Sequence, residues 1–265
     1  MTKSELTAFL EAELAAFPGR ASLLMVDLKR RKDLFAYNAD APAPAASLIK
    51  VPLLLTAVDL AAQGQLSLEQ NVPVPHILED TEVFEPENLR ENYALAELLE
   101  WMIIQSDNTA ANAVIDLVGM DAVNDFCRRV GAQSTVLRRR MLDFDAAAAG
   151  RDNTTSARDQ FQFFSLLAWC ADRSEIWRAA LEMFKRQRWQ DVLLRYICGP
   201  TPVAHKTGTL HGAAHDCGLF LDQSGPYFLG ALTWDASAPD GRTGSKRFLG
   251  KLSKTIYDCH MEGIL

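Results

Sequence analysis

The 265-residue sequence lacks long apolar runs and paired cysteines. Its apolar stretches, such as 51–55, are far shorter than the roughly 20 residues that a membrane-spanning helix needs, so no membrane partner is expected. The five cysteines are scattered and include no C-x-x-C pair. Neither a disulfide framework nor a zinc site is therefore predicted, and we expect reduced thiols, no metal and no other cofactor.

Basic residues are also scarce, with 27 Lys and Arg against 34 Asp and Glu and a formal charge of -7. An acidic surface repels phosphate backbones, so nucleic acid is not an expected partner. The one dense basic run, 138–140, is too short to change this conclusion. Hydrophobic residues make up 48% of the chain, which is enough for a sizeable core. We expect a monomer that acts on a small molecule or a peptide-like substrate.

The N-terminus shows no secretory signal. Residues 3–17 have apolar side chains at helical spacing with acidic residues between them, which predicts an amphipathic helix. A signal would show a basic start and an apolar centre. We therefore expect the protein to be cytoplasmic as the sequence stands, or secreted or periplasmic if a signal has been removed.

Strand-like and helix-like segments are separated along the chain. Runs typical of strands occur at 21–27 and 34–37 and again at 203–210, 217–222 and 227–235. Helical pieces lie between them, at 48–63, 94–105, 109–118, 121–130 and 156–171, and a last helix is expected at 244–260. This order predicts an α/β (α+β) fold with an antiparallel sheet made from both termini and flanked by helices. The sheet domain would comprise 1–40 and 198–265, and an inserted all-α domain 41–197.

The first chemical motif is Ser47-Leu48-Ile49-Lys50. Positions i and i+3 share a helix face, so the serine hydroxyl and the lysine amine can meet. A serine is a poor nucleophile until a base takes its proton, and a lysine can be that base if its pKa is lowered by burial or nearby cations. Pro52 lacks an N–H and crowds the carbonyl of Leu48, which predicts an irregular first turn. Taken alone, the motif also fits a solvated surface pair.

Two further motifs follow at long intervals. Ser106-Asp107-Asn108 lies between two predicted helices, where Asp107 or Asn108 is suited to cap the second one. Lys206-Thr207-Gly208-Thr209 lies on a predicted strand, where the glycine permits close approach of a ligand backbone. Each motif has a structural interpretation as well, a helix cap for the first and an edge strand for the second.

Together the three motifs, S-x-x-K, S-D-N and K-T-G in this order, are the signature of class A β-lactamases and penicillin-binding proteins. The chain resembles the class A β-lactamase family over nearly its full length. The surrounding stretches PAASLIKVPLLL, QSDNTAANAVIDLVG and VAHKTGTL add to the resemblance.

The resemblance implies a role for each matched residue. Ser47 would attack the lactam or amide carbonyl, and Lys50 would take its proton, directly or through water. Ser106 would pass a proton to the leaving nitrogen, and Asn108 would bind the acylamide side chain. The main-chain N–H groups of Ser47 and Thr209 would form the oxyanion hole.

The K-T-G strand would hold the other half of the substrate. The resemblance implies that Lys206, Thr207 and Thr209 bind the substrate carboxylate, with Gly208 between them.

One part of the family pattern is missing. Class A β-lactamases carry a glutamate on a loop that closes the site, followed four residues later by an asparagine, and that glutamate directs the deacylating water. The matching loop here, 138–152, contains neither residue. Asp143 and Asp145 are the only carboxylates in this loop that could replace the glutamate as the base for deacylation. A cap within the loop and a solvated surface charge are equally good interpretations of these two residues. An ion pair from Asp152 to Arg139 or Arg140 could still close the loop.

Three other residues are candidates for the cleft. His211 and His215 stand after the K-T-G motif, where we find no arginine, and Phe84 lies in an acidic stretch where an aromatic wall is expected. Structural histidines and a solvated loop are the alternatives.

Three functions remain open. The first is a β-lactamase that opens the lactam ring through an acyl-Ser47 intermediate. The second is a related penicillin-binding-type peptidase, esterase or amidase that β-lactams inhibit. The third is a non-catalytic sensor that is acylated once. The missing glutamate favours the second and third functions. One scaffold can host several functions, so the fold alone does not decide between them.

Overall fold

The computed structural model describes residues 1–85, 89–222, 225–237 and 241–265. Its helices are α1 (Lys3–Ala16), the 3₁₀ turn η1 (Ala46–Ile49), α2 (Lys50–Ala62), α3 (Leu95–Ile104), α4 (Asn108–Val118), α5 (Met120–Arg129), α6 (Phe144–Ala148), α7 (Ala157–Ala171), α8 (Glu175–Lys185) and α9 (Gly241–Met261). Its strands are β1 (Arg20–Asp27), β2 (Lys32–Tyr37), β3 (Ala43–Pro44), β4 (Asn71–Pro73), β5 (Asn92–Ala94), β6 (Thr154–Thr155), β7 (Val203–Leu210), β8 (Ala213–Phe220) and β9 (Tyr227–Trp234).

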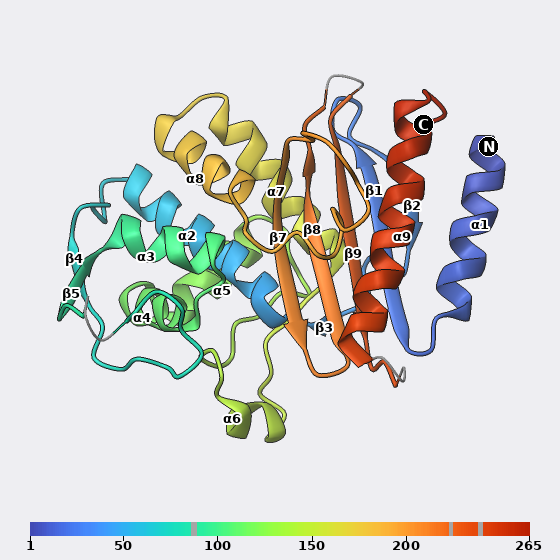
Figure 1. Ribbon diagram of the computed structural model, residues 1–265. Helices are drawn as coiled ribbons and strands as arrows, with labels where there is room; N and C mark the ends of the chain where they lie inside the picture. The colour runs from blue at the N-terminus through green and yellow to red at the C-terminus, as the bar shows by residue number, and fades with distance from the viewer. Residues whose placement is uncertain (86–88, 223–224, 238–240) are drawn as a thin grey trace.

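The main sheet joins the two ends of the chain. Its five strands are antiparallel and follow the order β2-β1-β9-β8-β7, so that β1 pairs with β9 over its whole length. The terminal helices α1 and α9 cover one face, and the helical segments cover the other (Figure 1). The predicted fold is confirmed: the apolar strands of both termini can only be buried by pairing with one another between two layers of helices.

The helical part is built around α2. Every residue of α2 from Lys50 to Val58 is buried, because α3, α4, α5, α7 and α8 surround it. The helical part enters after β2 and returns to the sheet at β7 (Figure 1). The exact division at residues 41 and 197 stays a prediction. Within the described ranges no helix has the length and apolarity to span a bilayer.

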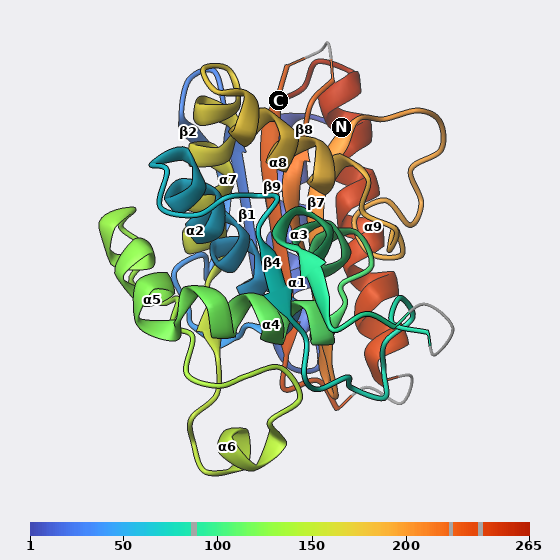
Figure 2. The same ribbon diagram turned by 90° about the vertical axis from the view of Figure 1, so that its left-hand side faces the viewer.

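Two helices were not among the predicted ones. Helix α6 is a single short turn within the loop 138–152, and it protrudes from the rest of the fold in both views (Figure 1, Figure 2). Helix α8 buries Trp177, Ala180, Met183 and Phe184 against α7 and α2. Five residues are too few for a periodic signal, and α8 follows α7 so closely that its apolar positions merge with those of α7.

Candidate active site

Ser47 lies in the 3₁₀ turn η1, and α2 begins directly after it at Lys50. The irregular first turn expected from Pro52 is confirmed, because a 3₁₀ turn precedes the regular helix. The side-chain amide of Gln160 donates to the carbonyl of Leu48 at 3.4 Å, so this carbonyl, four residues before the proline, keeps a donor. Ala46 has φ +47°, a conformation that a residue with a Cβ rarely adopts.

Lys50 is fully buried and its amine faces Ser47. Its Nζ lies 3.2 Å from the Ser47 hydroxyl, 2.6 Å from the main-chain oxygen of Ser106 and 2.6 Å from Oδ1 of Asn108. Burial lowers the pKa of Lys50 to about 7, and the nearby carboxylates of Asp107 and Asp80 oppose this shift only in part. A substantial fraction of the amine is therefore neutral at neutral pH and able to accept a proton.

Ser106 joins the end of α3 to the start of α4 and has φ +62°. This left-handed conformation directs its carbonyl towards Lys50, while its hydroxyl lies 2.9 Å from Nζ of Lys206 and 3.4 Å from Nζ of Lys50. The next residue, Asp107, is the N-cap of α4 and accepts from the N–H of Ala110 at 2.7 Å. The structural interpretation of Asp107 as a helix cap is confirmed.

Strand β7 brings Lys206 to the same place. It is an edge strand, yet Lys206 is fully buried because η1 and α8 pack against the strand. Burial, reinforced by the neighbouring amine of Lys50, holds the pKa of Lys206 well below its usual value. A Cβ placed on Gly208 would lie 3.1 Å from Cβ of Ala46, so only a residue without a side chain lets β7 lie this close to the nucleophile turn.

These elements enclose an open cleft of about 470 Å³. The cleft is lined by five of the predicted site residues, Ser47, Ser106, Asn108, Thr207 and Thr209. Lys50 and Lys206 lie directly beneath it, where Lys50 is hydrogen-bonded to Ser47 and Lys206 to Ser106. The remaining lining residues are Asp80, Glu82, Gln105, Asp107, Trp189, Asp191, Arg195, Thr243 and Lys246.

The sequence did not single out most of this second group. Asp80 and Glu82 come from the loop before β5, Trp189 and Arg195 from the segment before β7, and Lys246 from α9. None lies within a recognisable motif, and no local pattern indicates that three segments so far apart meet at one cleft. Their contribution is visible only in the tertiary structure.

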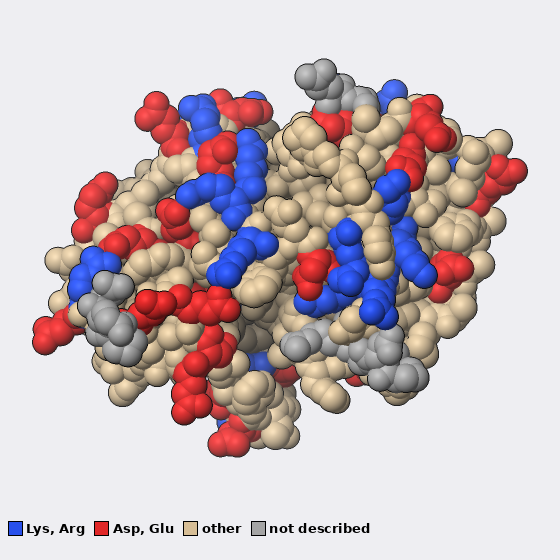
Figure 3. Space-filling model, in the orientation of Figure 1, with Lys and Arg blue, Asp and Glu red and all other residues tan. Residues whose placement is uncertain are grey.

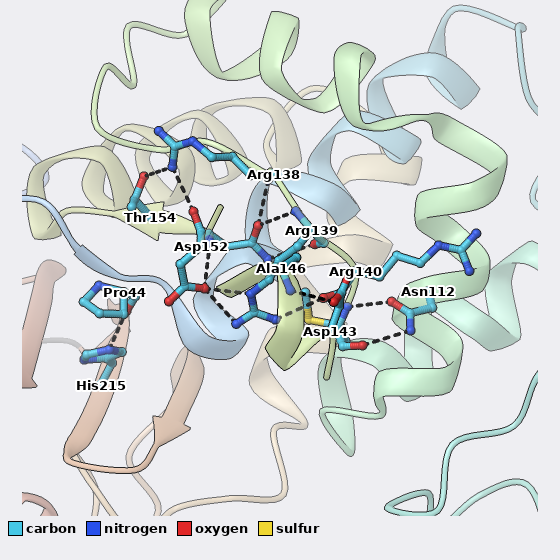
Figure 4. A network of polar contacts seen from close by, with 12 residues as sticks. Pro44, Asn112, Arg138, Arg139, Arg140, Asp143, Ala146, Asp152, Thr154 and His215 are labelled. Atoms are coloured by element: carbon cyan, nitrogen blue, oxygen red, sulfur yellow. Dashed lines mark hydrogen bonds and ion pairs between the residues drawn. The ribbon is translucent and has the colours of Figure 1, made fainter. Parts of the chain in front are cut away.

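The loop 138–152 is closed by a partly buried ion pair. Of the two candidate arginines, Arg139 forms the ion pair with Asp152 at 2.7 Å (Figure 4), whereas Arg140 pairs with Asp116. Asn153, directly beyond the predicted loop, accepts from the N–H groups of Arg138 and Arg139 at 2.7 and 3.0 Å. This buried amide replaces main-chain partners that the irregular loop cannot supply.

A second amide fixes the middle of the loop. Asn112 of α4 accepts from the N–H of Met141 at 2.8 Å and donates to its carbonyl at 3.2 Å (Figure 4). Met141 thereby reaches a small hollow of about 60 Å³ next to Ser47, where Leu142 and Phe144 join it. The loop therefore presents three apolar side chains and Arg139 to the hollow beside the nucleophile.

The structure does not bring the two tentative bases to the cleft. The carboxylate of Asp143 accepts from the N–H of Ala146 as the N-cap of α6 (Figure 4), and Asp143 lines a different hollow, which Ser47 does not line. Asp145 is exposed in the first turn of the same helix and lines neither the cleft nor the small hollow. The cap is favoured because a short helix leaves its first N–H groups without intrahelical partners.

Three further candidates also lie outside the cleft. His215 is buried and its ring contacts the carbonyl of Pro44 at 2.8 Å (Figure 4), and burial lowers its pKa to about 4. His211 is exposed in the turn between β7 and β8. Phe84 is neither a cleft wall nor solvated: it is buried edge-on against Tyr93 and Trp101.

Known proteins share the sequence pattern and the architecture of this chain. A family model described as "Beta-lactamase enzyme family" matches residues 3–259. The chain belongs to this β-lactamase family. A curated relative, a β-lactamase of Streptomyces fradiae, is 36% identical over 131 residues, which cover 46% of this chain and 42% of that protein. The alignment thus spans less than half of the curated relative.

Solved structures share the whole fold of this β-lactamase-family chain. A β-lactamase from Sphaerobacter thermophilus has a TM-score of 0.84 and 23% identity, covering 100% of this chain and 99% of that one. A mutant of PBP-A, solved as an acyl-enzyme complex with penicillin G, has a TM-score of 0.85 and 22% identity, covering 98% and 97%. At such identities the likeness establishes the fold. The family match supports a hydrolase of the β-lactamase type.

Proposed function

We propose that the protein is a class A-like serine hydrolase that opens β-lactam amides through an ester on Ser47. The observation that carries the proposal is the contact between the Ser47 hydroxyl and the buried amine of Lys50, whose pKa is about 7. A neutral amine at hydrogen-bond distance is what an unactivated serine requires. Family membership and the shared fold support the same reaction.

In the acylation step the Ser47 oxygen bonds to the lactam carbonyl carbon, and its proton passes to Lys50. Collapse of the tetrahedral intermediate breaks the C–N bond, and the proton reaches the leaving nitrogen through Ser106, whose hydroxyl contacts the amines of Lys50 and Lys206. The main-chain N–H groups of Ser47 and Thr209 hold the oxyanion. Such donors are worth roughly 3–4 kcal/mol each in comparable enzymes.

Substrate binding divides between the two sides of the cleft. Asn108 holds the acylamide group, while Lys206, Thr207 and Thr209 hold the carboxylate, and Gly208 lets β7 lie close to the nucleophile turn. Both subsites follow from residues that line or support the same cleft as Ser47.

Deacylation is the slow half of the proposed cycle. Water must attack the ester from a protected position beside Ser47. The loop lines the small hollow there with Arg139, Met141, Leu142 and Phe144, and no aspartate or glutamate of the described residues lines it. General-base assistance is typically worth 10²- to 10⁴-fold in rate. Its absence from this hollow favours an acyl-enzyme that persists far longer than the acylation step.

The test follows both half-reactions with one reagent. The protein is mixed with a chromogenic cephalosporin, and colour and intact mass are recorded over time. We expect rapid formation of one adduct, followed by slow steady turnover. Ser47→Ala should abolish the adduct and the colour, whereas Ser4→Ala in α1, on the far face of the sheet, should retain both. An adduct on Ser47→Ala would overturn the assignment of the nucleophile.

A further inference from the structure

The cleft is electrically polarised. Asp80 and Glu82 line the side formed by the loop before β5, and Arg195 and Lys246 line the side formed by the segment before β7 and by α9. Figure 3 shows a run of acidic side chains at the lower left of the central hollow, with basic ones above it, and a cluster of basic side chains on the right, around α9. The catalytic groups proposed above lie between these two sides.

On the acidic side, Asp80 is the carboxylate that remains open to a ligand. Glu82 forms an ion pair with Arg188 at 2.7 Å, and the buried Asp107 accepts from Thr81 and from the N–H of Ala110. Asp80 is exposed and accepts only a neutral donor, Nδ2 of Asn108 at 2.5 Å. Across the described ranges no lysine, arginine or histidine forms an ion pair with it.

The basic side has the opposite character. Lys246 pairs with Asp191, and Nη1 of Arg195 donates to the main-chain oxygen of the same aspartate at 3.3 Å. The buried Nε of Arg195 has no hydrogen-bond partner among the described residues. Lys246 therefore pairs with the carboxylate of Asp191, whereas Arg195 contacts only the main-chain oxygen of that residue. An anionic group on the substrate suits this side, and the acidic side suits a cation.

The position of Asp80 relative to Asn108 connects this polarity to the substrate. Under the proposed function, on which this inference rests, Asn108 holds the acylamide group. A carboxylate 2.5 Å from the Asn108 amide then lies beside the substituent on the carbon next to that group. We propose that the preferred substrate carries a cationic amine on this carbon, and that Asp80 is the residue that selects it.

Three penicillins form a matched set for the test. Benzylpenicillin and its α-amino and α-carboxy derivatives differ only in the substituent on the carbon next to the acylamide. Second-order rate constants for formation of the Ser47 adduct are measured by rapid-quench mass spectrometry. A solvent-exposed charge pair is worth only a modest factor, so we expect the amine to react about fivefold faster than the unsubstituted compound and the carboxylate about fivefold slower. Raising the salt from 0.05 to 0.5 M should shrink both differences.

Two variants assign the preference to a residue. Asp80→Asn should bring the three rate constants to within about twofold of one another, because it keeps an acceptor for Asn108 and removes the charge. Asp80 also acts on the pKa of Lys50, so the variant should change all three rates by a common factor, which the ratios cancel. Glu79→Gln, the exposed acidic neighbour that does not line the cleft, should preserve the wild-type ratios.

The outcomes separate the two proposals. Adducts that form at equal rates with all three penicillins would overturn the inference alone. Ratios that persist in Asp80→Asn would remove Asp80 as the selecting residue. A failure of every penicillin to acylate Ser47 would overturn the proposed function, and the inference with it.

Discussion

The amine of Lys50 lies 2.6 Å from the main-chain oxygen of Ser106, a residue with φ +62°. A non-glycine residue in this conformation costs about 1–3 kcal/mol and persists only where the surroundings hold it. Ala46 before the nucleophile and Leu142 beside the small hollow share positive φ values of 47° and 62°. Strained residues thus surround Ser47, as expected where main-chain groups are positioned for chemistry and not for stability alone.

The pH dependence of acylation should report Lys50. A base must be neutral to accept the Ser47 proton, and burial lowers the pKa of Lys50 to about 7. The rate constant for adduct formation should therefore rise between pH 6 and 8 and level off above. The same group makes the unfolded chain bind more protons than the folded protein between pH 7 and about 10, so its contribution to the unfolding free energy rises with pH there. A rate constant independent of pH from 5.5 to 8.5 would contradict the role of Lys50.

Gly208→Ala should impair acylation without unfolding the protein. The new Cβ would lie 3.1 Å from Cβ of Ala46 and 3.3 Å from the main-chain oxygen of Ala45, so β7 and the nucleophile turn must separate by a few tenths of an ångström. We expect the rate constant for adduct formation to fall about 10- to 100-fold, since small misplacements of reacting groups have effects of this order. The melting temperature should change by only a few degrees, and an unaltered rate would show that the close approach is not needed.

Met141→Glu should accelerate deacylation. Asn112 fixes the main chain of Met141 at the small hollow beside Ser47, so a carboxylate at this position would reach the water next to the ester. We expect loss of the adduct to become about 10²-fold faster, the lower end of general-base assistance. Met141→Gln, which has the same length without the charge, is the matched control. If both variants deacylate at the wild-type rate, the hollow is not the route of the water.

Asp143→Ala should affect stability and not chemistry. Asp143 caps α6 and lies in a separate hollow, so its removal should lower the unfolding free energy by about 1 kcal/mol. Adduct loss, followed by intact mass, should stay within twofold of wild type. Asp145→Ala, an exposed neighbour that caps nothing, should change the stability by less than about 0.5 kcal/mol. Tenfold slower adduct loss in Asp143→Ala alone would restore Asp143 as the base.

Much of the candidate site was predictable from local sequence. The i, i+3 spacing brings Ser47 and Lys50 together on any helical turn, and Pro52 makes that turn irregular whatever surrounds it. Strand patterns at both ends of the chain, with helical patterns between them, predicted the sheet from both termini, because apolar strands at the two ends have no other way to be buried. Asp107 as a cap also follows from its place between two helices.

Other features depend on contacts between distant segments. The choice of Arg139 over Arg140, the burial of Phe84 and His215, and the short helix α6 have no local signal, because each is decided by which neighbours lie within a few ångströms. Asp143 and Asp145 were candidates by composition alone, and only the direction of the loop excludes them from the cleft.

The sequence by itself determined which reactive side chains this protein contains and their order along the chain, since motifs and strand patterns are properties of neighbouring residues. The tertiary structure alone decided how those groups behave. The lowered pKa of Lys50 comes from complete burial, and the polarity of the cleft comes from Asp80 and Lys246, which line it from segments far apart in the sequence. Both are electrostatic effects, and they depend on distance and solvent exposure, which a linear sequence does not contain.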